Sequence, residues 1–574
     1  VPTARDPWVI LQSVPGVLTN DVNVGGNKSG YQQAFTGSGS LNWSNTYSLD
    51  GVLMNDPGYF NSAATYFGFG SLEEIEVSTG GSDASVIGGG VTLSLVTRRG
   101  TNDWRGSALY LIADDAWQSD LTPDSGDLGA GQDDFDQGNR IIRLEEYGFE
   151  GGGPLIHDRF WLWGHYGKND IDRVTVADGR DFTQLEFYGI KLNGQLSHRN
   201  SAVLFWTDSG KSVDGRGAGP TRAPLATWDQ WSRPGGLFKL EDTHIFGPQL
   251  FLSGLISYFE GPWGVTPKGG IDGVNAILDE NFVWQENFLY VDLEHQQRQA
   301  TLDSSYFLTA GGLDHEIRVG AVYRQVASDQ LWGWPGDAAR YDFYRSLGAP
   351  YNRVSINRQE RYPFTSEFSS LFLQDTLRVG RLTANVGLRY DYQRGHSSTA
   401  LVPGVPGFET LPDGTPLMPA VLVEGRDQSF TWGDLVPRLG LTWALDRERQ
   451  TLLRASYSRF STPMHQWYQS LEWPIGPASA EFYYEDLNGD GRVTVDEVVD
   501  YEDGPLATNG YDPLAQEGIA DIDPGFSAAL SDEFILGVEH AFLPELVVGL
   551  STTWRNQQDI EEYERLVVED GVER

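Results

Sequence analysis

The strongest constraint on the fold is the regular alternation of long and short links between strand-like segments. From residue 104 onward, apolar and polar side chains alternate in about fifteen segments, which is the period of a strand with two different faces. The long links are 114–140, 209–234, 260–297, 328–364, 395–434 and 462–529, and the short turns include 153–157, 379–381, 447–449 and 543–545. Short turns on one side and long loops on the other predict an all-β transmembrane antiparallel barrel.

The segments are expected at 104–113, 141–152, 158–169, 182–194, 200–208, 235–243, 249–259, 298–309, 315–327, 365–378, 382–394, 435–446, 450–461, 530–542 and 546–556. No run approaches the ~18 apolar residues of a membrane-spanning helix. Without such helices, only a barrel satisfies the backbone hydrogen bonds in lipid. A soluble β sandwich would also alternate, but it would not place arginine so regularly on its inner face.

The alternation also fixes which side chains face lipid. Because successive side chains point to opposite faces of a strand, one set should face lipid and the other the barrel interior. The expected lipid-facing residues are Leu382, Val386, Leu388, Tyr390, Leu439 and Trp443, and the expected inner residues are Arg389, Asp391 and Arg438.

Residues 1–100 have a different pattern and are expected to form a compact α/β domain. Glycine and proline interrupt short segments throughout, as in a small globular unit. Ile75 and Val77 alternate with glutamates, and a second alternating segment starts at Val91. A free soluble domain is the alternative, which the barrel-like remainder of the chain disfavours.

Five motifs follow one another along the chain: LDGV at 49–52, EEIEVSTGG at 73–81, VTRRGTNDWRGS at 96–107, SLFLQDTLRVGRLTANVGLRYD at 370–391 and VPRLGLTW at 436–443. Together they resemble the motifs of TonB-dependent outer-membrane receptors, in particular the Oar-like branch. The resemblance implies that residues 1–100 are a plug inside a barrel formed by 101–574. It also implies that this barrel is incomplete, that both ends of the protein are missing, and that the TonB box precedes Val1.

The resemblance further implies an outer-membrane location, embedded in lipid, and active uptake or export of an unidentified ligand bound at the outer loops. A TonB-type protein in the periplasm would supply the energy. The alternative is a surface adhesion protein anchored by its barrel. An enzyme is not expected, because no nucleophile or metalloprotease motif is present. A net charge of -39 makes nucleic acid an improbable partner.

Five charged residues near the end of the plug are candidates for contacts with the barrel wall. They are Glu73, Glu74, Glu76, Arg98 and Arg99. In the resembling family, charges on the plug help to hold it in place. An ordinary solvated surface is an equally open interpretation of these residues.

The sharpest local motif is a twelve-residue EF-hand-like loop at 486–497, within the long link 462–529. Its candidate calcium ligands are Asp486, Asn488, Asp490, the carbonyl group of Arg492, Thr494 and Glu497. Gly491 occupies the sharp turn, and Val493 is expected to pack inward. A short helix is expected after the loop, over 495–501. The alternative is an acidic loop that matches the spacing by chance.

Overall fold

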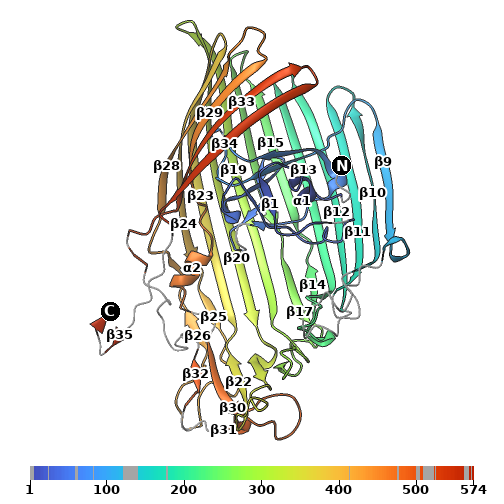
Figure 1. Ribbon diagram of the computed structural model, residues 1–574, viewed down its shortest axis with the longest axis vertical. Coiled ribbons are helices and arrows are strands. Elements are labelled where there is room, and N and C mark those ends of the chain that lie inside the picture. The colour runs from blue at the N-terminus through green and yellow to red at the C-terminus, as the bar shows by residue number, and fades with distance from the viewer. Residues whose placement is uncertain are drawn as a thin grey trace.

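The computed structural model describes residues 5–23, 25–58, 62–81, 83–119, 140–175, 179–412, 414–474, 478–499, 504–508, 522–523 and 525–560, with the backbone of β35 (Val568–Glu569) and β36 (Val572–Glu573). Long antiparallel strands form a barrel wall, and the N-terminal residues lie inside it (Figure 1). None of the helices among these residues has the length and apolar character needed to cross a membrane.

The wall follows the order of the chain, and neighbouring wall strands are antiparallel. Its elements are β9 (Arg105–Asp114), β10 (Arg140–Ile156), β11 (Phe160–Val174), β12 (Arg180–Ser197), β13 (Asn200–Arg216), β14 (Trp228–Ser232), β15 (Gly236–Ile245), β16 (Leu250–Glu260), β17 (Trp263–Pro267), β19 (Tyr290–Ala310), β20 (Leu313–Gly333), β23 (Glu360–Val379), β24 (Leu382–Ser397), β27 (Arg426–Asp427), β28 (Trp432–Ala444), β29 (Thr451–Ser461), β33 (Leu530–Leu543) and β34 (Leu546–Gln558). β14 and β15 pair in succession with β13, as β16 and β17 do with β19, so each pair forms one interrupted wall strand.

The predicted wall strands are confirmed in position, but several are longer than expected. β19 and β20 each have 21 residues, whereas strands of ~10 residues suffice to cross the membrane. The extra length lies toward the outer loops, where both faces of a strand meet protein or water. Because no lipid contacts this part of the strand, apolar and polar residues need not alternate there. The strand therefore continues beyond the alternating segment.

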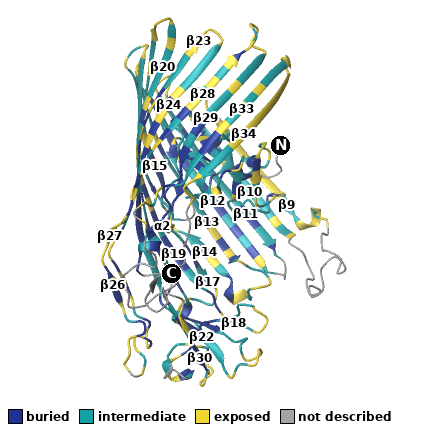
Figure 2. Cartoon of the chain, turned by 60° about the vertical axis from the view of Figure 1, so that its left-hand side comes forward, coloured by how far each residue is buried: buried dark blue, intermediate teal, exposed yellow. Residues whose placement is uncertain are grey.

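The predicted facing of the wall strands is also confirmed. Val386, Leu388 and Tyr390 are 50%, 45% and 46% exposed, whereas the alternating residues Arg389 and Asp391 are 0% and 1% exposed. On the neighbouring strand, Leu439 and Trp443 are exposed on the outer face and Arg438 is buried on the inner face. Figure 2 shows the same alternation of exposed and buried residues along the wall strands.

The inner domain is built around a four-stranded sheet. Its order is β4 (Val52–Leu53), β3 (Thr46–Leu49), β8 (Thr92–Thr97) and β7 (Leu72–Ser78), with β3 and β8 parallel. A five-residue helix, α1 (Pro7–Leu11), packs beside the sheet, and Asp6 caps its first turn by accepting a hydrogen bond from Trp8 N at 2.8 Å. The domain is therefore mostly strand, with less helix than an α/β domain implies.

The long outer links, expected only as loops, contain strands of their own. Three of them form one sheet, with the order β18 (Ala276–Leu278), β21 (Ala338–Tyr341), β22 (Asn352–Asn357), β30 (Ser479–Tyr484) and β31 (Val498–Val499), and β32 (Ala507–Thr508) also pairs with β30. A separate hairpin joins β25 (Ala400–Val402) and β26 (Val421–Val423). These elements lie at the lower end of the molecule in Figure 1, opposite the short turns.

Candidate functional site

The turn between β3 and β4 fixes the plug to the wall. Asp50 and Gly51 have φ angles of 47° and 82°, the left-handed pair of a tight hairpin turn. The Asp50 carboxylate lies 3.0 Å from Lys191 Nζ on β12 and accepts hydrogen bonds from the backbone N–H and side chain of Thr97. The Asp50 carbonyl oxygen accepts a further hydrogen bond from Lys239 Nζ at 2.5 Å. The LDGV motif therefore forms a turn and an anchor at once.

A second contact holds residues 83–90 of the plug, which we call the clamped segment. Arg318 Nη1 lies 2.9 Å from the Asp83 carboxylate, and Gln374 Oε1 accepts a hydrogen bond from Ala84 N at 2.9 Å. Arg389 donates to the carbonyl oxygens of Ala84 and Ser85 at 3.1 and 3.0 Å. Along the same segment, Arg438 donates to the carbonyl oxygen of Val86, and Arg555 to that of Gly89. Side chains from β20, β23, β24, β28 and β34 thus converge on one short stretch of backbone.

The glycines of the clamped segment permit this close approach. A Cβ atom on Gly88 would lie 2.3 Å from the carbonyl oxygen of Ser44, within the plug. A Cβ atom on Gly89 would lie 2.9 Å from the ring of Phe460, on wall strand β29. Because both distances are shorter than real Cβ contacts, the backbone can lie here only without side chains.

The opposite side of the plug meets the wall through apolar packing. Phe205 of β13, Leu237 of β15 and Phe259 of β16 belong to the same buried cluster as the plug side chains Trp8 and Tyr47. These wall residues are at most 3% exposed. The plug is therefore held by this apolar contact and the Asp50 turn on one side, and by the polar contacts of the clamped segment on the other.

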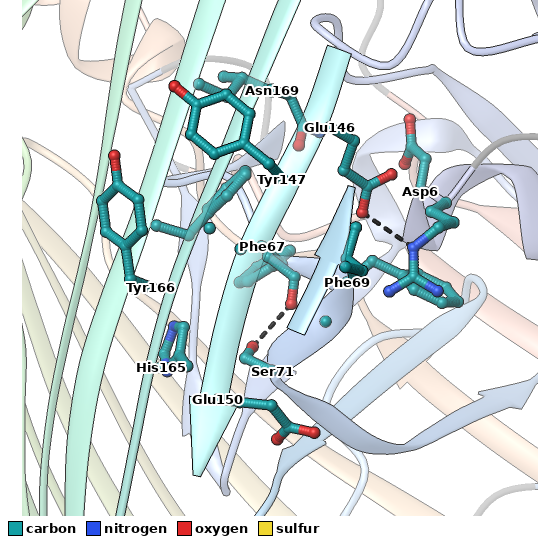
Figure 3. A pocket seen from close by; sticks show the side chains of 18 of the residues that line it. Asp6, Phe67, Phe69, Ser71, Glu146, Tyr147, Glu150, His165, Tyr166 and Asn169 are labelled. Carbon is teal, nitrogen blue, oxygen red and sulfur yellow. Dashed lines mark hydrogen bonds and ion pairs between the residues drawn. The ribbon is translucent and has the colours of Figure 1, made fainter. Parts of the chain in front are cut away.

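A cavity of about 280 Å³ lies between the plug and β9 to β12 (Figure 3). Arg5 of the plug donates to Glu146 of β10 at 2.8 Å across this cavity. Asp6, 3% exposed, also lines it, and burial raises the pKa of Asp6 to about 8, although hydrogen bonds from Trp8 and Asn23 favour the charged form. The cavity contains both charges and aromatic rings, with Phe67, Phe69, Tyr147 and Tyr166 among its lining.

Among the five predicted plug charges, the structure places one in contact with the wall. Arg98 pairs with Glu150 of β10, beside the cavity, and its Nε lies 3.6 Å from Glu73 within the plug. Glu74 and Glu76 are exposed on β7, and Arg99 is also exposed. The main anchors, Asp50 and the clamped segment, were not among the predicted site residues. The Asp50-Gly51 sequence could have indicated the turn at Asp50. The arginines expected on the inner face could have indicated contacts with the clamped segment.

The EF-hand-like loop lies at the outer end of the molecule, between β30 and β31. Asp486 Oδ1 accepts a hydrogen bond from Gly489 N at 2.7 Å, and Asp490 Oδ1 accepts one from Arg492 N at 2.8 Å. Gly491 has a φ of 75°, as the sharp turn requires. Val493 is 9% exposed and packs into the core of the outer sheet, as predicted.

The carboxylates of this loop are engaged with protein groups. Glu497 Oε1 and Oε2 accept hydrogen bonds from Leu487 N and Thr494 N, and Arg340 Nη1 lies 3.3 Å from Asp486 Oδ2. Over the described part of the chain, no three acidic or histidine side chains converge closely enough to hold a metal ion. Of the helix expected over 495–501, the described residues form only a 3₁₀ turn, Val495–Glu497, because Val498 and Val499 pair with β30 as β31. Residues 500 and 501 lie outside the described residues.

A plug enclosed by long antiparallel strands, with short turns at one end and an elaborate sheet at the other, defines an outer-membrane β-barrel protein. Residues 173–551 match the family model described as "Outer membrane beta barrel domain", and the chain belongs to this family. It is located in the outer membrane.

The chain is 25% identical to the TonB-dependent transporter Oar of Myxococcus xanthus over 647 residues. This match covers 91% of the chain and 58% of the Oar sequence, so the chain spans little more than half of that relative. Its fold is similar to that of the outer membrane transporter YddB from Escherichia coli, with a TM-score of 0.65, 10% identity, and coverage of 97% of this chain and 67% of YddB. The ferric enterobactin receptor PfeA from Pseudomonas aeruginosa gives a TM-score of 0.58 at 13% identity, over 97% of this chain and 70% of PfeA. At these identities, the solved structures show the likeness of fold alone.

Proposed function

We propose that this protein is a TonB-dependent transporter, in which a periplasmic energy-coupling protein displaces the plug and so admits a ligand bound at the outer end. The observation that carries the proposal is the unequal attachment of the plug. Its apolar contact with β13, β15 and β16 excludes water, whereas the clamped segment is held by hydrogen bonds and one ion pair, which water can replace. The similarity to Oar supports transport over adhesion, for which no feature of the described residues argues.

The unequal attachment predicts where a passage opens. Separating Phe205, Leu237 and Phe259 from the plug would expose apolar surface, at about 25 cal/mol per Å². Withdrawing the clamped segment from Arg389 and Arg438 exchanges protein hydrogen bonds for water hydrogen bonds, at a net cost of about 1.5–3 kcal/mol for each bond, because both donors are charged. Water can take the place of these partners but cannot compensate exposed apolar surface, so the clamped segment should leave the wall first.

Cysteine labelling in living cells tests this proposal, since the chain has no cysteine of its own. Ala84→Cys reports on the clamped segment, and Ala63→Cys is the matched control in the plug core; these alanines are 0% and 5% exposed. A maleimide should label Ala84→Cys in energised cells and not after the proton gradient is collapsed, while Ala63→Cys stays protected in both. Equal labelling of Ala84→Cys in the two conditions would refute transport driven from the periplasm.

We further propose that calcium binds the loop 486–497 and orders the outer sheet. The proposal is supported by the ligand spacing and by the left-handed turn at Gly491. Asn275 links the loop to a second outer link, because it donates its N–H to the carbonyl oxygen of Gly491 at 3.1 Å and accepts from Val493 N at 2.8 Å. Binding would draw Asp486, Asp490 and Glu497 together and transmit that order through Asn275. Calcium titration of the purified protein, followed by calorimetry, tests it.

A further inference from the structure

A second cavity, of about 330 Å³, lies between the plug and the outer half of the wall at β13, β14, β16 and β17. Its plug side includes Tyr31, Gln33 and Tyr66, and its wall side includes Lys211 and Arg216. Three carboxylates, those of Asp56, Asp208 and Glu260, also line it, and each accepts hydrogen bonds from other protein groups. It lies toward the ends of β13 and β14 that lead into the outer loops. A molecule in this cavity would touch plug and wall together.

Three neighbouring wall strands are irregular around this cavity. The pairing of β13 with β14 shifts between Asp214 and Arg216, where Gly215 has a φ of 82°. Such a bulge reverses the side-chain alternation, so it brings Arg216 to the inner face, on which Lys211 and Val213 already lie. The next two wall strands are also interrupted, between β14 and β15 and between β16 and β17. Bulges that re-aim side chains are typical of binding sites.

Lys211 and Arg216 lie within ion-pair distance of no carboxylate among the described residues, unlike most inner cations of the wall. Lys211 is 5% exposed, donates to the Tyr66 hydroxyl at 2.9 Å, and lies 4.2 Å from the centre of the Tyr31 ring. Arg216 donates to Gln230 Oε1 at 2.6 Å. Neither forms an ion pair with any residue that the structure describes. By comparison, Arg173, Lys191, Arg318, Arg389 and Arg555 each contact a carboxylate.

The remaining inner cations without an acidic partner serve the plug. Arg324 and Arg438 donate hydrogen bonds to the carbonyl oxygens of Asn55 and Val86, so both already have partners in the plug. Lys211 and Arg216 instead border open space, and their positive charges repel one another. The carboxylate of Asp181 attracts Lys211, but it is already paired with Arg173 at 2.8 Å. One carboxylate among three cations leaves an excess of buried positive charge, which is costly unless a further anion joins them.

A third donor lines the same cavity from the plug. Gln33 is 4% exposed, and its Oε1 accepts a hydrogen bond from Gln12 at 3.1 Å. Within the described residues, the Nε2 of Gln33 is a buried donor without a hydrogen-bond partner. Buried donors are almost always satisfied, so this amide also indicates an acceptor that comes from outside the chain.

We propose that this cavity binds a small oxyanionic solute, which bears carboxylate or phosphate groups. Arg216 and Lys211 supply the positive charge, Gln33 supplies a neutral donor, and the rings of Tyr31 and Tyr66 border the site. This proposal names a class of ligand for the proposed transporter. It rests on the transport function only in taking that ligand to be the transported solute. Binding itself requires no energy coupling, so the two can fail separately.

Calorimetry on the purified protein tests the proposal with four probes: citrate, pyrophosphate, the neutral trisaccharide raffinose and the cation spermidine. Citrate or pyrophosphate should bind, and raffinose and spermidine should not. The oxyanion that binds more tightly shows whether the cavity prefers carboxylate or phosphate groups. If neither oxyanion binds more tightly than raffinose, the proposal is overturned.

Variants locate the binding site. Lys211→Gln and Arg216→Gln should each weaken oxyanion binding about tenfold or more, because each removes a charged hydrogen-bond donor. Arg345→Gln is the matched control, since Arg345 is an exposed outer arginine paired with Glu485 at 3.2 Å, and it should bind as the parent does. If Lys211→Gln does not assemble, the binding measured for Arg216→Gln tests the proposal by itself. Arg216 is only half-buried, so this variant should still fold. Unchanged binding in Arg216→Gln would place the anion elsewhere.

Failure of the proposed function gives a different result. If Ala84→Cys is never labelled in energised cells but citrate or pyrophosphate binds through Arg216, the cavity is real and the transport proposal is wrong. If Ala84→Cys is labelled and no oxyanion binds, transport stands and the ligand class is wrong.

Discussion

Lys191 on the barrel wall and Asp50 on the plug form an ion pair of 3.0 Å, with side chains only 6% and 7% exposed. The two residues are 141 positions apart in the chain. This contact joins the LDGV turn of the plug to β12, and Lys239 holds the same turn through the Asp50 carbonyl group. The turn is therefore the point at which the plug and the barrel fix each other's position.

Removal of one partner should loosen the plug. Lys191→Met leaves a buried carboxylate without its counter-charge, which costs about 3–5 kcal/mol. Lys28→Met is the control, because the Lys28–Asp21 pair at 3.6 Å is far more exposed and contributes about 1 kcal/mol or less. The measurement is the urea concentration at which protease cuts the plug within the folded barrel. Equal midpoints for the two variants would contradict the anchoring role of Lys191.

The facing of β24 predicts which substitutions block membrane assembly. Val386 is 50% exposed on the outer face, so Val386→Arg should cost about 2–4 kcal/mol if it lies near the bilayer midplane. The neighbouring Asn385→Arg points into the barrel and should assemble. Folding into lipid vesicles, followed by the gel migration of unheated samples, measures the difference. Normal assembly of Val386→Arg with failure of Asn385→Arg would reverse the facing.

The outer loop predicts a calcium effect. Outer sites need only weak affinity, of about 10⁻⁴–10⁻³ M. Calcium should slow proteolysis of the outer loops, and Asp486→Ala with Glu497→Ala should abolish both binding heat and protection. Asp496→Ala is the control, since position 11 supplies no ligand. Arg340→Gln should bind calcium more tightly, because the guanidinium group 3.3 Å from Asp486 no longer competes. If the double variant binds calcium as the parent does, the loop is not a calcium site.

The buried cap of α1 predicts a pH dependence for the plug. Burial raises the pKa of Asp6 from 3.8 to about 8, so the folded plug retains a proton that the unfolded chain releases. The plug should therefore lose stability as the pH rises from about 4 to 8. Asp6→Asn keeps a cap without the charge and should flatten this decline. Urea midpoints for plug release at pH 5 and pH 8.5 measure it, and parallel declines in parent and variant would exclude Asp6 as the cause.

The sequence predicted the wall well because lipid imposes a strict alternation on each strand. It predicted β24 over 382–394, and the strand is Leu382–Ser397. The outer sheet could not be predicted, because its strands are short and pair across long separations, as Ala276 does with Ala339. Each is at most six residues long, so even the alternation of Ala480 and Phe482 with Ser479 and Glu481 in β30 is too short to predict a strand. The anchor at Asp50 was visible as a turn, but its partners on distant strands were not.

The central claim is that the plug closes the barrel and opens it at the clamped segment. A Cβ atom on Gly387 would lie 3.0 Å from the Cβ of Ala84, close to the ~3.5–4.5 Å of a disulfide. Ala84→Cys with Gly387→Cys should therefore lock the clamped segment to β24. On the other side of the plug, the hydroxyl oxygens of Thr65 and Ser209 lie 2.5 Å apart, so Thr65→Cys with Ser209→Cys is the matched lock.

The decisive measurement is the conductance of each oxidised variant in planar bilayers as urea is raised below the concentration that unfolds the barrel. We expect the barrel of the variant with the Thr65→Cys and Ser209→Cys disulfide to conduct at the same urea concentration as the parent. The barrel of the variant with the Ala84→Cys and Gly387→Cys disulfide should not conduct until a reductant is added. Opening of the oxidised Ala84–Gly387 variant at the same urea concentration as the parent would contradict the account.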